Sequence, residues 1–157
     1  MDLILWRHAE ALAQQPGQGD LERALTTKGE QQAKRMAQWL NRHLPESTRI
    51  VASPALRCQQ TASALGRKFR TVAEVAPDVD PRNLLRAARW PEGSEPVLLV
   101  GHQPTLGLVA SLLLTGASLP WTVRKGAVWW FRQRDGLGDG EVGSEVVLHA
   151  VQAPDCL

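Results

Sequence analysis

The sequence predicts an α/β fold, a three-layer sandwich in which a mostly parallel central sheet carries helices on both faces. Short apolar runs alternate along the chain with segments whose apolar residues recur at helical spacing. The runs are continuously apolar rather than alternating, as is typical of strands buried on both sides. The length of 157 residues fits one domain, which we place at residues 1–157.

The first predicted elements are a buried strand at residues 2–7 and a loop at residues 11–22, which is rich in Gln, Gly and Pro. Thr27 and Glu30 fit a capping box, in which their side chains satisfy free amides at a helix start. The helix that follows is expected to end at Pro45, and its buried face is predicted to comprise Ala33, Met36, Ala37, Leu40 and Leu44.

A short strand is predicted at residues 49–52, directly before Ser53 and Pro54. Serine favours the N-cap of a helix and proline its first turn, so we expect a helix from there to about Gly66. Another strand is predicted at residues 71–75.

The second half of the chain continues the alternation of helices and strands. The predicted elements are a helix from Asp80-Pro81 to about Trp90, a strand at 97–100, a helix at 105–114, and strands at 127–132 and 145–151. The glycine-rich connection at residues 135–140 has neither the Lys-Ser/Thr nor the following helix of a P-loop, so we expect a hairpin rather than a phosphate cradle.

Composition excludes several classes of protein. The net charge of +2 reflects a small excess of arginine rather than a basic patch, and we expect no nucleic-acid partner. The apolar stretch at 106–114 is too short to span a bilayer and the start lacks a signal peptide, so we expect no membrane association. Two distant cysteines, Cys58 and Cys156, make neither a disulfide framework nor a zinc site, and the expected location is the cytoplasm.

Polar residues follow three of the predicted strands. Arg7 and His8 end the first strand, Arg57 follows the second, and His102 follows the strand at 97–100. Because ligands bind beyond the carboxyl ends of parallel strands, these side chains should meet at one edge of the sheet. A lone histidine or arginine there is usually structural, but three such coincidences favour a site. Arginines and helix N-termini bind phosphate, and a histidine among them can act as a nucleophile.

Four motifs strengthen this interpretation. They are L-W-R-H-A-E-A at 5–11, Arg23 with L-T-T-K-G at 25–29, A-S-P-A-L-R-C-Q-Q-T-A at 52–62, and V-G-H-Q-P at 100–104. In this order they resemble the motifs of the histidine phosphatase superfamily, in its phosphoglycerate-mutase-like branch. The short length and the R-H-A-E-A start look most like the SixA-type phosphohistidine phosphatases. Ala9 stands where the family usually has glycine.

The resemblance implies a phosphoglycerate-mutase-like fold and a role for each matching residue. His8 would be the nucleophile that takes the phosphoryl group on a ring nitrogen. Arg7 and Arg57 would clamp the phosphoryl oxygens, and His102 would stabilise charge in the transition state. Arg23 matches a further phosphate-binding arginine of the short members; its alternative is a loop charge that faces water.

The general acid is less clearly marked. Larger members of the family carry an acidic residue on an insertion, whereas residues 75–97 hold little beyond one helix. Glu10 is the nearest carboxylate in sequence, and a structural charge beside the N-terminal loop is the alternative. A metal held by His8, Glu10 and His102 is a further alternative, but the adjacent arginines would repel a cation, so we expect no metal and no cofactor.

The sequence therefore predicts a metal-independent phosphatase that works through a phosphohistidine intermediate. A phosphohistidine substrate suits a site without a firm acid, because imidazole leaves more easily than an alkoxide. The expected partner is a phosphorylated signalling protein, such as a histidine phosphotransfer domain. The alternatives are a phosphomonoesterase or mutase acting on a small phosphorylated metabolite, and a phosphate-binding regulatory module without turnover. Retention of both His8 and His102 argues against the last of these.

Overall fold

A computed structural model describes residues 1–135 and 144–157 of the chain. Its single sheet has six strands in the order β3-β2-β4-β1-β5-β6. The strands are β1 (Asp2–Arg7), β2 (Arg49–Ala52), β3 (Arg70–Thr71), β4 (Val97–Gly101), β5 (Val128–Asp135) and β6 (Ser144–Gln152). The helices are α1 (Thr27–His43), α2 (Leu56–Ser63), α3 (Pro81–Ala87) and α4 (Thr105–Thr115), with 3-10 turns η1 (Asp20–Glu22), η2 (Ala73–Val75) and η3 (Pro154–Cys156).

The sheet is mostly parallel, as the sequence predicts. Strands β3, β2, β4 and β1 pair in parallel, whereas β5 joins β1 and β6 joins β5 in antiparallel fashion. Strand β1 therefore lies inside the sheet between β4 and β5, and its four central residues, 3–6, are fully buried. The end of β1, where the site residues begin, is held from both sides.

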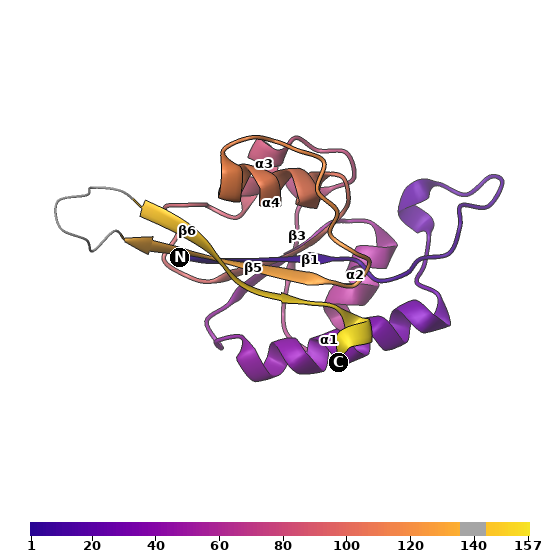
Figure 1. Cartoon of the computed structure of the whole chain (residues 1–157). Coiled ribbons are helices and arrows are strands. Elements are labelled where there is room, and N and C mark those ends of the chain that lie inside the picture. Colours follow the sequence, from indigo (N-terminus) through magenta and orange to yellow (C-terminus); the bar gives the residue numbers. More distant parts are fainter. Residues whose placement is uncertain (136–143) are drawn as a thin grey trace.

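Helices cover both faces of the sheet, which confirms the predicted three layers (Figure 1). On one face, Met36 and Leu40 of α1 and Ala62 of α2 pack against Ile4 and Trp6. On the other face, Leu84 of α3 and Leu106 and Val109 of α4 pack against Leu3, Leu5 and Leu99. Alternate side chains of β1 thus enter opposite cores, as the period of two in a strand requires. Among the described residues, no helix is long and apolar enough to cross a membrane.

Two predicted helix starts are wrong in detail. Helix α1 is capped by Thr26 rather than Thr27, because Thr26 is extended and its Oγ1 accepts from Gly29 N–H at 2.9 Å. Helix α2 begins at Leu56 with Ala55 as its N-cap, and Ser53 is not the cap. The Ser53 hydroxyl instead contacts His102, a residue 49 positions away that no local signal reveals.

Some predicted boundaries also differ. The strand expected at residues 71–75 is only the two-residue β3, followed by η2. Helices α2 and α3 end before Gly66 and Trp90, whereas β5 and β6 are longer than expected. The glycine-rich connection predicted at residues 135–140 falls almost entirely outside the described residues.

Candidate active site

His8 follows β1 directly and is held through its backbone. Its N–H donates to Gly101 O at 3.1 Å, and its carbonyl accepts from Gly126 N–H at 3.1 Å. The His8 Nδ1 lies 2.7 Å from the carbonyl oxygen of Ala9. Because a carbonyl only accepts, Nδ1 carries the ring proton, and Nε2 keeps its lone pair. The structure thus sets the tautomer that a nucleophilic Nε2 needs.

The charge state of His8 supports the same conclusion. The side chain is 7% exposed. Burial, together with the charges of the nearby Arg57 and Arg7 guanidinium groups, lowers the pKa of His8 to about 4 despite the favourable Ala9 contact. At neutral pH the ring is therefore uncharged and can attack an electrophile.

His102 lies beside His8, with 5.3 Å between the ring centroids. Its Nδ1 is 3.3 Å from Arg57 Nη2, and its Nε2 is 2.7 Å from Ser53 Oγ. A guanidinium group only donates, so Nδ1 is the acceptor and Nε2–H donates to Ser53. Burial, followed by the charges of His8 and Arg57, lowers the pKa of His102 to about 3, so this ring is neutral as well.

Arg57 lies in the first turn of α2 and is 3% exposed. Its Nη1 donates to the carbonyl oxygen of Asp20 at 2.8 Å and its Nη2 to the Asp20 carboxylate at 3.0 Å. Arg7, at the end of β1, donates from Nη1 to the Val123 carbonyl at 2.9 Å. Within the described residues, Arg7 Nε and Arg57 Nε are both buried without a hydrogen-bond partner. Unpaired buried donors are costly, so both arginines are held at the site at the expense of stability.

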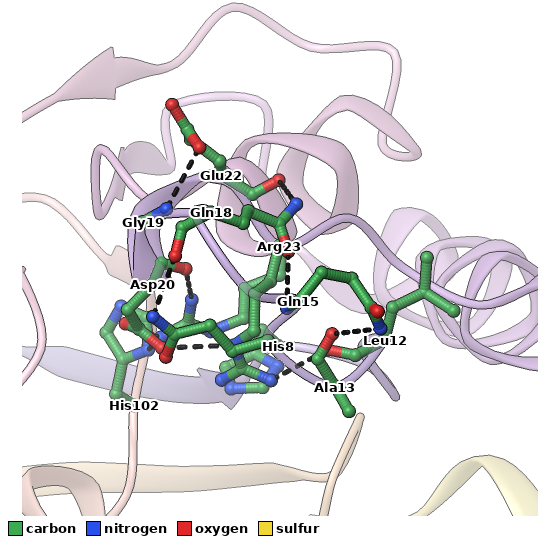
Figure 2. A network of polar contacts seen from close by, with 12 residues as sticks. His8, Leu12, Ala13, Gln15, Gln18, Gly19, Asp20, Glu22, Arg23 and His102 are labelled. Atoms are coloured by element: carbon green, nitrogen blue, oxygen red, sulfur yellow. Dashed lines mark hydrogen bonds and ion pairs between the residues drawn. The ribbon is translucent and has the colours of Figure 1, made fainter.

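Arg23 reaches the same place from the loop that follows β1. Its Nε donates to the Asp20 carboxylate at 3.0 Å, and its Nη1 donates to the Leu12 carbonyl at 2.9 Å. Figure 2 shows this loop network next to His8 and His102. Asp20 therefore bridges Arg23 and Arg57. Burial alone would raise the pKa of Asp20, but hydrogen bonds from Arg57 and Arg23 outweigh it and lower that pKa, so the carboxylate is ionised.

These side chains line one open cavity of about 390 Å³. Its lining includes five of the six predicted site residues, and the complete set is Arg7, His8, Ala11, Asp20, Arg23, Arg57, Pro77, Asp78, His102, Gln103 and Lys125. Sequence reasoning missed Asp20, Asp78, Lys125 and the supporting Ser53. Asp20 begins η1 and Arg23 follows it three positions later as its C-cap, which is a weak local signal. Tertiary structure alone brings Asp78 and Lys125 to the cavity and places Ser53 behind His102.

Glu10, the sixth predicted residue, does not line the cavity. Its carboxylate accepts from Thr26 Oγ1 at 2.8 Å, at the start of α1. The backbone of Glu10 packs closely against α1 at Gly29, where a Cβ would be 2.0 Å from the Glu10 carbonyl oxygen. The structure thus fits the structural alternative for Glu10. It also separates Glu10 from the metal-ligand set considered with His8 and His102, and the described residues contain no group of three or more potential metal-binding side chains.

Ala9, which departs from the usual glycine, is accommodated without strain. Its side chain is fully buried in a small apolar cluster with Leu25 and Ala33. Its N–H donates to Thr61 Oγ1 at 3.2 Å. The methyl group therefore packs between α1 and the loop, and Ala9 is not part of the cavity lining.

At one edge of this α/β sheet, two neutral histidines and three arginines line the same cavity. This set of side chains is suited to an enzyme that transfers phosphoryl groups. Consistent with this, residues 3–88 match the model of the histidine phosphatase superfamily, branch 1. The chain is 32% identical over 128 residues to phosphohistidine phosphatase SixA of Escherichia coli K12, covering 76% of this chain and 78% of that protein. The chain therefore belongs to the histidine phosphatase superfamily and is a phosphatase.

Within this superfamily the chain is a homologue of SixA. It superposes on a putative phosphohistidine phosphatase SixA from Agrobacterium tumefaciens with a TM-score of 0.78 and 25% identity, over 98% of this chain and 97% of the other. A structure of SixA complexed with tungstate shares the fold, with a TM-score of 0.80 and 24% identity over 99% of both chains. These matches confirm the fold that the resemblance implied.

Proposed function

We propose that this protein hydrolyses the phosphorus–nitrogen bond of phosphohistidine, with His8 as the nucleophile. The observation that carries the proposal is the tautomer of His8. Its Nδ1–H is committed to the Ala9 carbonyl, the ring is neutral, and it lines a cavity that three arginines surround. A neutral imidazole with a free Nε2 lone pair is a competent nucleophile toward phosphorus.

The reaction has two displacements. In the first, the Nε2 lone pair of His8 forms a bond to phosphorus while the substrate P–N bond breaks, and its electron pair returns to the substrate imidazole, which takes a proton from solvent. In the second, water attacks the phosphoryl group on His8. The P–Nε2 bond breaks, its electron pair returns to Nε2, and the water protons remain with the released phosphate and the solvent.

The other residues act on the charge of the phosphoryl group. Arg7 and Arg57 line the cavity, and their guanidinium groups clamp the phosphoryl oxygens. His102 lines the same cavity, and a bound negative phosphoryl group would raise the pKa of its ring, which favours donation from Nδ1 to the phosphoryl oxygens. Arg23 adds a third cation, and Asp20 holds Arg23 and Arg57 in place in the ligand-free enzyme.

The proposed substrate class follows from the leaving group and from the cavity. The carboxylates that line the cavity are Asp20 and Asp78, and Asp20, which bridges two arginines, is ionised and so has no proton to give to an alkoxide. Imidazole needs less assistance, because its pKa lies near neutrality. Residues 75–97 add only α3 above the sheet, which leaves the cavity open to a side chain carried by another protein. The relative from E. coli is named for phosphohistidine, which supports this assignment. A cytoplasmic histidine phosphotransfer-type domain is the partner that we propose.

The test compares the wild type with the His8→Ala variant, without added metal and with EDTA present. We expect kcat/KM to be higher for a phosphohistidine-bearing protein than for sugar phosphates or phosphoglycerate. A rapid quench should trap one acid-labile, base-stable phosphoryl group on His8, and folded His8→Ala should neither turn over substrate nor be labelled.

Three results would contradict this proposal. Labelling of another residue would reassign the nucleophile, and loss of activity in EDTA would contradict metal independence. Faster turnover of a small phosphate ester than of every phosphohistidine protein would favour the phosphomonoesterase alternative.

A further inference from the structure

A second concentration of charge lies on the outer edge of the sheet, along β3. Two cavities of about 500 and about 440 Å³ adjoin this edge, and both are lined by Arg49 of β2 and Arg70 of β3. Together they gather six cations, which we call the basic edge: Arg49, Arg67, Lys68, Arg70, Arg86 and Arg89. The small net charge of the whole chain did not predict this patch, because the fold assembles it from β2, β3, α3 and the connections beside them.

The positive charge of the basic edge is not neutralised by its surroundings. None of the six cations lies within 4.0 Å of a carboxylate in the part of the chain that the structure describes. The acidic groups nearby are Glu74, which lines the second cavity, and Glu95, which acts on Arg49 from a distance. Burial, followed by the charges of Arg89 and Arg70, lowers the pKa of Arg49 despite Glu95. The cations therefore repel one another, and an anion bound among them would relieve this repulsion.

Part of the basic edge is fixed in position and part is free to bind. Arg49 donates to the Ala87 carbonyl at 3.1 Å, and Arg67 donates to the carbonyls of Leu44 and Pro45 at the end of α1. The other four cations are exposed, and among them Arg86 donates to Asn83 Oδ1 at 3.0 Å. Strand β3 is the last strand on this side of the sheet, so its outer backbone groups have no strand partner among the described residues. Because β3 has only two residues, this edge offers few backbone groups, and the four exposed cations are what an acidic segment would contact.

The basic edge is linked to the active site by one short segment. Val72 lines the second edge cavity, and Pro77 lines the active-site cavity. Five residues of chain span at most about 18 Å, so the two cavities lie within the reach of one bound protein.

We propose that the basic edge docks an acidic segment of the phosphorylated protein whose phosphohistidine enters the active site. This inference rests on the proposed function, because it names the surface that selects the phosphoprotein. Docking of this kind lowers KM for the protein substrate and leaves the chemistry at His8 unchanged.

The test uses phosphohistidine peptides that carry an arm of ten glutamates or of ten glutamines, together with free phosphohistidine. Each arm is placed in turn on the N-terminal and on the C-terminal side of the phosphohistidine. At low salt we expect the wild type to prefer the glutamate arm by about fivefold in kcat/KM, mostly through KM, and to lose the preference at high salt. The double variant Arg70→Glu/Arg89→Glu should lose the preference and keep its rate on free phosphohistidine; Arg70→Gln/Arg89→Gln is the milder second pair.

The matched control is Lys34→Glu/Arg42→Glu, which makes the same change in net charge at exposed positions of α1. It should keep the preference for the glutamate arm. Equal rates for the two arms in the wild type, or an unchanged preference in the Arg70/Arg89 variants, would overturn the proposal. So would stronger competition by an RNA oligonucleotide than by a glutamate peptide.

Binding of a labelled deca-glutamate peptide, measured by anisotropy, tests the basic edge without turnover. We expect the wild type to bind this peptide more tightly than the Arg70/Arg89 variants do, and equal binding would contradict the docking surface alone. Failure to hydrolyse any phosphohistidine substrate would instead contradict the proposed function.

Discussion

Replacing Ser53 by alanine tests whether the orientation of His102 is set from behind the active site. Ser53 is fully buried, and its Oγ is the acceptor for His102 Nε2–H at 2.7 Å. In Ser53→Ala the remaining neighbour of Nε2 is Cys58 Sγ at 3.4 Å, a weak acceptor. Ser53 Oγ also accepts from Ala55 N–H, at 3.2 Å, so a second buried donor loses its partner.

The expected size of the effect follows from these contacts. A buried donor without a partner costs about 1–3 kcal/mol. His102 can avoid that cost by turning toward another acceptor, and this movement displaces the Nδ1 that faces the phosphoryl group. We therefore expect kcat to fall by about 10- to 100-fold, which corresponds to about 1.4–2.8 kcal/mol, and the free energy of unfolding to fall by a similar amount.

The assay measures kcat and KM on free phosphohistidine across pH 5–8, with ¹⁵N chemical shifts of His102 as the readout of its tautomer. Ser111→Ala is the matched control, because Ser111 is fully buried and makes comparable contacts to Ala117 O and Leu119 N–H away from the site. This control should lose stability and keep its kcat. A Ser53→Ala enzyme with the wild-type kcat, pH profile and tautomer would refute the positioning role of Ser53.

Three other predictions concern the charges of the site. Arg57→Ala should reduce kcat/KM more than Arg23→Ala, because a buried, preorganised donor is worth about 2–4 kcal/mol in the transition state, whereas the Arg23 side chain is 23% exposed; equal losses in steady-state kinetics would contradict this ranking. The pKa of His8 is 6.5 in the unfolded chain and about 4 in the folded protein, so the unfolded state binds more protons between these pH values. Acidification from pH 6.5 to 4 should therefore lower the free energy of unfolding by about 3 kcal/mol through this residue. Denaturant titrations in which the wild type loses no more stability over that range than a His8→Asn variant would refute this prediction. Asp20→Asn should tighten inhibition by orthophosphate about three- to tenfold, because one negative charge leaves the cavity. Glu10→Gln should change neither inhibition nor turnover by more than about twofold; a large effect of Glu10→Gln with none of Asp20→Asn would show that Glu10 acts in the site.

The sequence identified the parts of the fold and site that depend on local pattern. The apolar runs of β1 and β4 predicted two buried strands, which the structure shows to be neighbours, and the ends of these strands supplied Arg7, His8 and His102. Their meeting could be predicted because parallel strands end at a common edge. The helix start after Ser53 was approximately right, although the reason given for it was wrong.

The errors share a physical cause, which is competition between local and distant partners. Ser53 is a good N-cap in isolation, but its hydroxyl bonds to His102 across the sheet. Glu10 adjoins the site in sequence, yet Thr26 and the close approach of Gly29 turn its carboxylate toward α1. Asp20 lies in a predicted loop, and only the fold places its carboxylate between Arg23 and Arg57.

The anchoring of His8 separates the nucleophile from the loop at residues 12–24, so the two can be engineered independently. The nucleophile belongs to the sheet, because its N–H and its carbonyl are bonded to Gly101 and Gly126 on either side. Residues 12–24, by contrast, leave and return at one point, where Ala11 and Leu25 form an isolated bridge. A loop closed at its base can change in length at small entropic cost to the rest of the chain. Libraries that rebuild residues 12–24 around a retained Arg23 should therefore redirect the choice of substrate while the reacting nitrogen stays where it is.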